Sequence, residues 1–216
     1  MDFFPLYLSA KLAVITTSVL ILISAPLAYF LVYVKCPGKF LFEALINLPI
    51  ALPPTVIGLY LLYIMGPKGY VGTIWGEVFG GTLLFTFTGI VIATAVYSLP
   101  FAVQPIKATF EKMDHRLREN AYVLGLSPVA TFFRVMIPNS INGIAAAAIL
   151  VFLHSMGAFG VILMVGGSIS GETRVASIAI YEAVETMNYR EAWLLSLAFV
   201  PISYFFLLLV NRLTRS

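Results

Sequence analysis

The residues that could perform chemistry are few and widely separated. The chain has 10 Asp and Glu residues, two His and one Cys among its 216 residues. No His, Asp and Glu residues have the spacing of a metal site, no nucleophile lies near a plausible base, and no glycine-rich loop is suited to bind a phosphate. The single cysteine, Cys36, excludes a disulfide within the chain and a multi-cysteine metal site. We therefore expect no catalytic residue, no bound metal and no cofactor in this chain.

The longest polar stretch of the chain, residues 114–138, has the residue spacing of two short helices. Asp114 can cap the first helix, because its carboxylate can accept a backbone N–H that has no partner there. Gly125 follows as a residue that can end a helix in a left-handed conformation. Three apolar residues of this helix share one face, namely Leu117, Ala121 and Leu124.

The second helix is expected to begin at Ser127 and to end at Pro138. Ser127 can cap it, and Pro128 suits its first turn, where a missing N–H costs nothing. Its apolar face would consist of Val129, Phe132, Phe133 and Met136. Since the two helices are too short and too charged to cross a bilayer, something else must cover their apolar faces. We interpret residues 114–138 as a docking element.

The rest of the chain has the composition of an integral membrane protein. It is 60% hydrophobic and 11% charged, with a mean hydropathy of +0.97, far from the averages of soluble domains. We expect an all-α fold in a single transmembrane domain, residues 1–216, because five apolar runs are long enough to cross about 30 Å of hydrocarbon. The spans are expected at about residues 12–34, 44–65, 83–106, 140–167 and 192–210. The net charge of +3 does not indicate nucleic-acid binding, because the basic residues are scattered.

The basic residues also predict how the chain crosses the membrane. With five spans and the N-terminus outside, nine of the 13 Lys and Arg residues lie on the cytoplasmic side, in agreement with the positive-inside rule. They are Lys35, Lys39, Lys107, Lys112, Arg116, Arg118, Arg134, Arg212 and Arg215. The C-terminus is then cytoplasmic, residues 107–138 form a cytoplasmic loop, and residues 166–190 form an external loop.

The second span is expected to be broken or kinked. Pro49, Pro53 and Pro54 precede Gly58 within it, and each interior proline frees a carbonyl group one turn back. Such a group is tolerated in a membrane only where it meets protein or a water-lined cavity. Candidates for a pathway through the membrane are therefore Pro53, Pro54, Thr55 and Gly58, and a simple packing kink is the alternative.

Two other spans carry polar residues that allow the same two interpretations. In the third span, a helical face would consist of Thr82, Thr86, Gly89 and Ala93. Small residues of this kind allow close helix packing, or a neutral route for a solute, which makes Thr86 a pathway candidate. In the fourth span, His154 is the only ionisable residue. It can form a hydrogen bond between helices or contribute to the pathway.

Two segments are expected to lie outside the hydrocarbon. Residues 66–81 are expected to form a short loop, with Trp75 and Phe79 at the membrane interface. Residues 166–190 carry too many charges for a span. A short amphipathic helix is expected there, with an apolar face formed by Ala176, Ile180, Val184 and Met187.

The predicted spans contain no Asp or Glu, residues that proton-coupled transporters usually carry. Sodium coupling through backbone carbonyls remains open, although five spans without an internal repeat do not favour it. A channel that needs no energy source is a further alternative. The interpretation we favour is that a cytoplasmic partner supplies energy by receiving the docking element in a groove.

The docking element resembles the EAA motif of ABC-importer permeases. That motif has the pattern E-A-A-x3-G-x9-I-x-L-P, and the same spacing is found in Glu119-Asn120-Ala121, Gly125 and Val135-Met136-Ile137-Pro138. The resemblance implies a type I ABC-importer permease fold, with a coupling helix seated in a groove of an ATP-hydrolysing subunit. The residues implied in coupling are Glu119, Asn120, Ala121, Gly125, Pro128, Phe132, Phe133, Ile137 and Pro138.

Other segments resemble the permease subunits of molybdate importers, to which tungstate and sulfate permeases are closely related. These segments are Pro37-Gly38-Lys39, Leu48-Pro49, residues 52–58 and Gly171-Glu172-Thr173-Arg174. Ala158 departs from the family, because relatives often have a glutamate at its position, and no role of that glutamate carries over. The resemblance implies import of molybdate or tungstate, with sulfate or another small solute as the alternative.

The same resemblance implies the partners of the chain. It would form a homodimer in the cell membrane of a prokaryote, with two cytoplasmic ATPase subunits that bind ATP and Mg²⁺ and with an external oxyanion-binding protein. The permease itself would be non-catalytic. Candidates for contact with the binding protein are Gly171, Glu172, Thr173 and Arg174. A local pair between Glu172 and Arg174 that orders the loop is the alternative.

Overall fold

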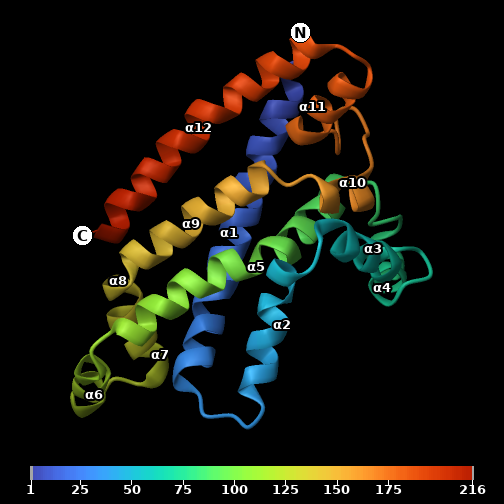
Figure 1. The fold of residues 1–216 in the computed structure, drawn as a ribbon. Helices are drawn as coiled ribbons and strands as arrows, with labels where there is room; N and C mark the ends of the chain where they lie inside the picture. Colours follow the sequence, from blue (N-terminus) through green and yellow to red (C-terminus); the bar gives the residue numbers. More distant parts are fainter. Residues whose placement is uncertain (1, 216) are drawn as a thin grey trace.

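The computed structural model describes residues 2–215, and over this range the chain is built from helices without a strand (Figure 1). Three helices are long and apolar enough to cross a membrane by themselves: α1 (Phe4–Tyr33), α5 (Phe87–Lys112) and α12 (Tyr189–Arg215). Two further pairs of helical segments meet at sharp bends, Lys39–Ala51 with Pro54–Met65 and Pro128–Asn139 with Ile141–Met156, so the described residues provide up to five crossings if each pair counts as one. The prediction of a helical protein with several membrane spans is confirmed.

The second predicted span is broken, as its prolines indicated. It consists of α2 (Lys39–Ala51) and α3 (Pro54–Met65), and the chain bends by 116° between them. Leu52 and Pro53 lie at the break with ψ angles of 142° and 140°. The ring of a proline pushes the preceding residue out of the helical region. Pro53 has this effect on Leu52, and Pro54 has it on Pro53, so α2 ends here.

The segment predicted as the fourth span, residues 140–167, consists of two helices. α9 (Ile141–Met156) ends at Gly157, and α10 (Gly160–Gly166) follows after a short irregular segment. α10 packs against α3 and α5. Gly58 of α3 permits this contact, since a Cβ atom there would lie 2.7 Å from the Cβ atom of Met164. The second halves of the two broken spans are thus packed against each other.

We expect Gly58→Ala to lower the melting temperature of the protein in detergent. The added methyl group would meet two side-chain atoms of Met164 at 2.7 and 2.9 Å, and overpacking of this kind typically costs about 1–3 kcal/mol. Gly76→Ala is the matched control, because its methyl group would approach only the Gly81 carbonyl oxygen, at 3.7 Å. Equal melting temperatures for the two variants would contradict the close contact between α3 and α10.

The prediction of a loop over residues 66–81 is wrong, because a helix occupies most of that segment. This helix is α4 (Tyr70–Phe79). Trp75 and Phe79 lie one turn apart on it, and their ring centroids are 4.2 Å apart. The two aromatic residues therefore pack on each other, which their spacing in the sequence permits but does not establish.

The third span begins after Thr86, later than predicted. The Thr86 hydroxyl oxygen accepts the N–H of Gly89 at 3.1 Å, and the hydroxyl donates to the carbonyl oxygen of Leu83 at 2.8 Å. Thr86 is therefore the N-cap of α5, and Thr82 also precedes the helix. The predicted helical face that joins both threonines to Gly89 is wrong, because neither threonine belongs to the helix.

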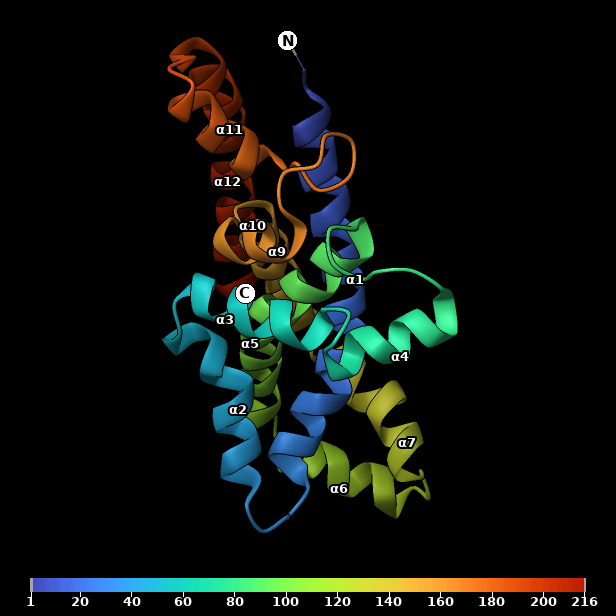
Figure 2. The same ribbon diagram turned by 90° about the vertical axis from the view of Figure 1, so that its right-hand side faces the viewer.

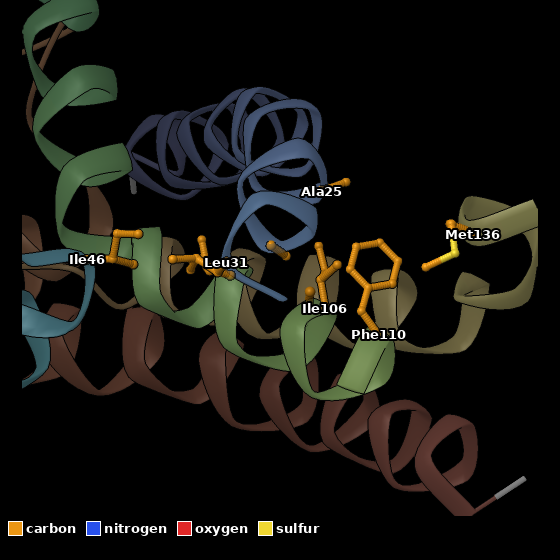
Figure 3. Close-up of a cluster of buried hydrophobic side chains, with 9 residues drawn as sticks. Ala25, Leu31, Ile46, Ile106, Phe110 and Met136 are labelled. Carbon is orange, nitrogen blue, oxygen red and sulfur yellow. The ribbon is translucent and has the colours of Figure 1, made fainter. Parts of the chain in front are cut away.

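The centre of the bundle is formed by α1, α5 and α9, each of which packs against the other two. Figure 3 shows a cluster of nine buried side chains that includes Leu31 of α1 with Ile106 and Phe110 of α5. Ile46 of α2 and Met136 of the docking element belong to the same cluster. The docking element is therefore attached to the spanning helices through a shared core and not by the chain alone.

The predicted external segment contains α11 (Ala176–Glu185), as expected of an amphipathic helix. Its buried residues are Ala176, Ile178, Ala179 and Ala183. Val184 and Met187 are 47% and 77% exposed, so the predicted apolar face is wrong for them, because α1 and α12 cover a different side of the helix. Figure 2 shows α11 and the start of α1 at one end of the molecule and α6 (His115–Val123) at the other.

Candidate docking surface and membrane pathway

The first helix of the docking element, α6, has the ends that the sequence predicts. The Asp114 side chain caps it by accepting the N–H of Arg116 at 2.9 Å. Gly125 follows the helix with a φ angle of +81°. Two backbone hydrogen bonds close this end, from Gly125 to Tyr122 at 2.9 Å and from Leu126 to Ala121 at 3.0 Å. This is the Schellman arrangement, which a left-handed residue after a helix makes possible.

The second helix of the docking element begins as the sequence predicts. Ser127 caps α7 (Pro128–Thr131) by accepting the N–H of Ala130 at 3.2 Å. Pro128 occupies the first helical position, where its missing N–H is not needed. The turn between the two helices is therefore fixed at both ends by residues whose roles follow from their type and spacing.

The predicted end of this second helix, at Pro138, is wrong. The chain continues from α7 through a π-helical turn (Phe132–Met136) into α8 (Ile137–Asn139), and the bend of 74° comes only at Ser140, before α9. In a regular α-helix the ring of Pro138 would meet the carbonyl group four residues earlier. The wider π turn accommodates the ring, and the 3.6-residue periodicity of the sequence does not reveal such a turn.

The apolar residues of the docking element divide into an inner and an outer set. Ala121 and Met136 are buried, with 4% and 0% of their surface exposed, and Met136 packs in the core that α1 and α5 share. Leu124, Val129 and Phe133 form the outer set and are 78%, 67% and 64% exposed. Both predicted apolar faces thus exist, but only the outer set is open to a partner.

An apolar groove lies next to the outer set, between the docking element and α1. It has a volume of about 290 Å³ and is lined by Pro26, Tyr29, Pro128, Val129, Phe132 and Phe133. Phe132 is partly buried, and its ring meets that of Tyr29 edge to face at 5.3 Å. Of the other coupling candidates, Ile137 is partly buried, and the exposed ones are Glu119, Asn120, Pro128 and Pro138.

Arg118 fixes α6 to the end of α1, a contact that no sequence pattern indicates. Its guanidinium carbon lies 4.4 Å from the centroid of the Tyr33 ring, which is a cation–π contact. Tyr33 in turn donates its hydroxyl hydrogen to the carbonyl oxygen of Phe110 in α5, at 2.7 Å. The helix α6 is therefore linked through Tyr33 to two spanning helices, α1 and α5.

Polar contacts that the sequence did not predict join α2 to α5. Lys107 forms an ion pair with Glu43. The side-chain amide of Gln104 donates to Asn47 Oδ1 at 2.7 Å. Lys107, at the start of the predicted cytoplasmic segment 107–138, lies in α5, which continues to Lys112.

Three of the six pathway candidates line one cavity. Pro54, Thr55 and His154 surround it together with Tyr97, and its volume is about 460 Å³. The lining residues come from α3, α5, α9 and α10, so the cavity lies where the two broken spans are interrupted. Residues that are distant in the sequence are thus brought together by the two breaks.

The other three pathway candidates occupy structural positions. Gly58 is buried against Met164, Thr86 caps α5, and Pro53 separates α2 from α3. None of the three is among the residues that line the cavity. Their contacts are those of packing, capping and breaking a helix.

His154 forms a hydrogen bond between helices and also borders the cavity. Its Nδ1 atom lies 2.9 Å from Ser98 Oγ in α5. Its ring contacts two aromatic rings of α5, with centroid distances of 4.1 Å to Phe101 and 4.5 Å to Tyr97. The geometry is compatible with both interpretations that the sequence allowed.

Thr173 is buried, so the prediction that it contacts an external protein is wrong. Its hydroxyl donates to the carbonyl oxygen of Gly166 at 2.7 Å and accepts the N–H of Ile169 at 3.0 Å. Gly171 and Glu172, next to it in the chain, are exposed. The loop therefore offers these two residues to a partner and uses Thr173 to hold its own shape.

Arg174 takes part in a local ion pair, but with a different partner from the one predicted. Its Nε atom lies 2.7 Å from Oε2 of Glu182 in α11. Ser168 donates to the other oxygen of the same carboxylate. These two bonds tie the loop to α11, and they leave Glu172 as an exposed charge beside them.

We expect Thr173→Val to lower the melting temperature in detergent, while Glu172→Gln leaves it unchanged. The valine would leave the carbonyl group of the buried Gly166 and the N–H of Ile169 without their partner, and an unpaired buried polar group typically costs about 1–3 kcal/mol. Thermal unfolding of the two variants beside the wild type measures the difference. A Thr173→Val protein as stable as the wild type would contradict the internal role of this side chain.

Membrane-length helices, two interrupted segments that border a cavity, and a projecting helix pair with exposed apolar residues are features of a membrane transport protein. Within residues 2–215, no group of three or more His, Cys, Asp or Glu residues could hold a metal ion. The chain belongs to the family described as the binding-protein-dependent transport system inner membrane component, which matches residues 18–216.

Relatives with assigned functions match most of the chain. It is 43% identical over 194 residues to the molybdenum transport system permease protein ModB of Azotobacter vinelandii, covering 89% of this chain and 86% of that protein. It is 34% identical over 186 residues to ModB of Escherichia coli K12, covering 84% and 81%. It is also 33% identical over 205 residues to the probable sulfate transport system permease protein cysT of Zygnema circumcarinatum, covering 95% and 70%.

A solved structure has the same fold. In the crystal structure of a bacterial ABC transporter that imports the acidic polysaccharide alginate, one chain superposes with a TM-score of 0.71 over 97% of this chain and 78% of that chain. The identity is 15%, so this likeness concerns the fold alone. Together with the family match, it confirms the resemblance to ABC-importer permeases that the motifs indicated.

Proposed function

We propose that the chain is the membrane permease subunit of an ABC importer that translocates molybdate or tungstate. Family membership and fold support the role of a permease. The observation that carries the substrate is the 43% identity to ModB over 89% of the chain. Sulfate is the alternative substrate, and the cysT protein supports it less strongly, at 33% identity with 70% of its own length covered.

One domain, residues 1–216, is proposed to cross the membrane of a prokaryotic cell five times. The crossings are α1, α2 with α3, α5, α9 with α10, and α12. The distribution of nine against four of the 13 Lys and Arg residues supports an N-terminus outside and a C-terminus in the cytoplasm. In Figure 2, α6 and α7 lie at the opposite end of the molecule from α11, which fits a cytoplasmic loop 107–138 and an external loop 166–190.

Two of these chains are proposed to form a homodimer with the pathway on its axis. Five spans enclose too little space for a pathway within one subunit, and twofold pairs are the commonest assembly. An external oxyanion-binding protein would deliver the solute to the loop that carries Gly171 and Glu172. Arg174 would act there indirectly, by holding the loop against α11 through Glu182.

Two cytoplasmic ATPase subunits are proposed to receive the docking elements. The outer set, Leu124, Val129 and Phe133, would enter a groove of each ATPase, with Glu119 and Asn120 at its edge. ATP-driven closure of the ATPases would then move each docking element as a rigid body, and the spans would alternate between inward-facing and outward-facing states. Met136 and Arg118 would transmit this motion, because Met136 packs in the core shared by α1 and α5 and Arg118 contacts Tyr33 of α1.

The permease is proposed to be non-catalytic, with ATP and Mg²⁺ bound only by the ATPases and with no cofactor or nucleic acid bound by this chain. Its substrate is tested by identifying the external protein that binds the purified permease–ATPase complex and measuring the affinity of that protein for molybdate, tungstate and sulfate. We expect it to bind molybdate or tungstate far more tightly than sulfate. A preference for sulfate would replace the proposal by its alternative.

A further inference from the structure

The ring of His154 is held in one orientation by three residues of a single turn of α5. Ser98 Oγ lies 2.9 Å from Nδ1, and the rings of Tyr97 and Phe101 contact the imidazole with centroid distances of 4.5 and 4.1 Å. The second ring nitrogen, Nε2, makes no hydrogen bond within the described part of the chain. The fixed ring therefore presents one free nitrogen.

A short chain of hydroxyl groups decides whether that nitrogen is a donor or an acceptor. Ser155 is buried, with 1% of its surface exposed, and the hydrogen-bond partner of its hydroxyl among residues 2–215 is Ser98 Oγ, at 3.4 Å. If Ser155 donates to Ser98 and Ser98 donates to Nδ1, both hydroxyl hydrogens are used, and the proton of the neutral imidazole lies on Nε2. If Nδ1 carried the proton and donated to Ser98, Ser98 would donate to Ser155, and the buried Ser155 hydroxyl hydrogen would have no acceptor. An unpaired buried donor costs free energy. The first order is favoured, so Nε2–H is a donor.

The cavity that His154 borders is uncharged and mostly apolar, with polar side chains at only a few of its lining residues. Thr55 and Tyr97 also line it, and their hydroxyl groups have no hydrogen-bond partner among the described residues. No Lys, Arg, Asp or Glu belongs to the lining within residues 2–215. Figure 2 shows α3 and α10, which contribute to the cavity, at mid-height between α11 at one end and α6 at the other. A tetrahedral oxyanion in this space would meet hydrogen-bond donors without meeting a fixed charge.

The geometry points to His154 Nε2–H as a fixed hydrogen-bond donor that a tetrahedral oxyanion meets during its passage, with the hydroxyl groups of Thr55 and Tyr97 beside it. This inference rests on the proposed function, because it takes an oxyanion as the solute. Ser98 is a positioning residue: by donating to Nδ1 it keeps the proton on Nε2. A carboxylate here would repel a dianion, and a fixed cation would retain it. Conduction requires binding that is favourable enough for the ion to enter the site and weak enough for it to leave.

The test uses the complete complex of permease, ATPases and external binding protein in proteoliposomes, with molybdate uptake and ATP hydrolysis measured together. His154→Leu removes the donor at similar volume, and His154→Gln keeps an amide N–H at about the same reach. We expect His154→Leu to lower molybdate uptake per ATP hydrolysed by about tenfold, the usual effect of losing a hydrogen bond to a charged group. We expect His154→Gln to retain most of the uptake, and Ser98→Ala to fall between them.

The inference would be overturned if His154→Leu took up as much molybdate per ATP as the wild type. It would also be overturned if His154→Gln and His154→Leu lost uptake equally, because the loss would then be due to packing and not to the hydrogen-bond donor. If His154→Leu does not assemble with the ATPase, uptake per ATP is compared between Ser98→Ala and Ser98→Thr. Only Ser98→Ala, which lacks the hydroxyl group, is expected to lose uptake per ATP. Equal uptake by that pair would also overturn it. A wild-type complex that takes up no oxyanion would instead contradict the proposed function.

Discussion

Gly125→Val is expected to abolish co-purification of the ATPase with the permease while leaving insertion into the membrane intact. Gly125 has a φ angle of +81°, in a region that costs an L-residue about 1–2 kcal/mol and a β-branched residue more. Valine would favour a different backbone conformation, and the two hydrogen bonds that close α6 would be lost. The outer set would then no longer be presented as one surface.

Gly171→Val is the matched control for this experiment. Gly171 has a φ angle of +85°, and neither glycine has an atom within 4 Å of an added Cβ. The backbone strain is therefore the same, but Gly171 lies in the proposed external loop. We expect Gly171→Val to co-purify with the ATPase as the wild type does. Unchanged co-purification of Gly125→Val would count against docking at residues 114–138.

Phe133→Ala is expected to weaken ATPase binding by about 30-fold, since truncation of a central aromatic residue of an interface costs at least about 2 kcal/mol. Phe133 is 64% exposed and borders the groove against α1, so it contributes little to the fold of the isolated chain. The measurement is the equilibrium affinity of the detergent-solubilised permease for the purified ATPase.

Phe79→Ala is the control for that variant. Phe79 is 65% exposed, almost as much as Phe133, but it lies on α4, away from the docking element. It is expected to leave ATPase affinity unchanged. If both variants lost affinity equally, the effect would be a general loss of stability, and the outer set would not be the docking surface.

The parts of the fold that the sequence predicts are those controlled by neighbouring residues. Asp114, Ser127 and Gly125 occupy the cap and turn positions expected of them, because a cap depends on one side chain and the first turn beside it. The break before α3 follows in the same way from Pro53 and Pro54. Each of these predictions needs no knowledge of the rest of the molecule.

The parts that sequence patterns do not predict depend on contacts between distant segments. Thr173 is as polar as its neighbours, and only the fold shows that Gly166 and Ile169 use its hydroxyl inside the loop. The inner position of Met136 and the outer position of Phe133 cannot be told apart by apolarity, because the core of α1 and α5 covers one and not the other. The contact between Arg118 and Tyr33 joins residues that no local rule connects.

The residues proposed from the sequence as pathway candidates were only partly correct as cavity-lining residues. The prolines at the break and the lone histidine were recognised as unusual residues for a membrane span, and Pro54, Thr55 and His154 do meet. Pro53, Gly58 and Thr86 were recognised by the same reasoning, yet they separate, pack and cap helices. Residue type alone does not distinguish a group that lines a cavity from one that shapes the helices around it.

The most direct test of the whole account is molybdate uptake by proteoliposomes that contain the permease, the ATPase and the external binding protein. We expect uptake that requires ATP in the compartment where the docking element lies, that requires the ATPase, and that is lost in Gly125→Val. Uptake that proceeded without ATP, or that followed a sodium gradient in the absence of the ATPase, would contradict it.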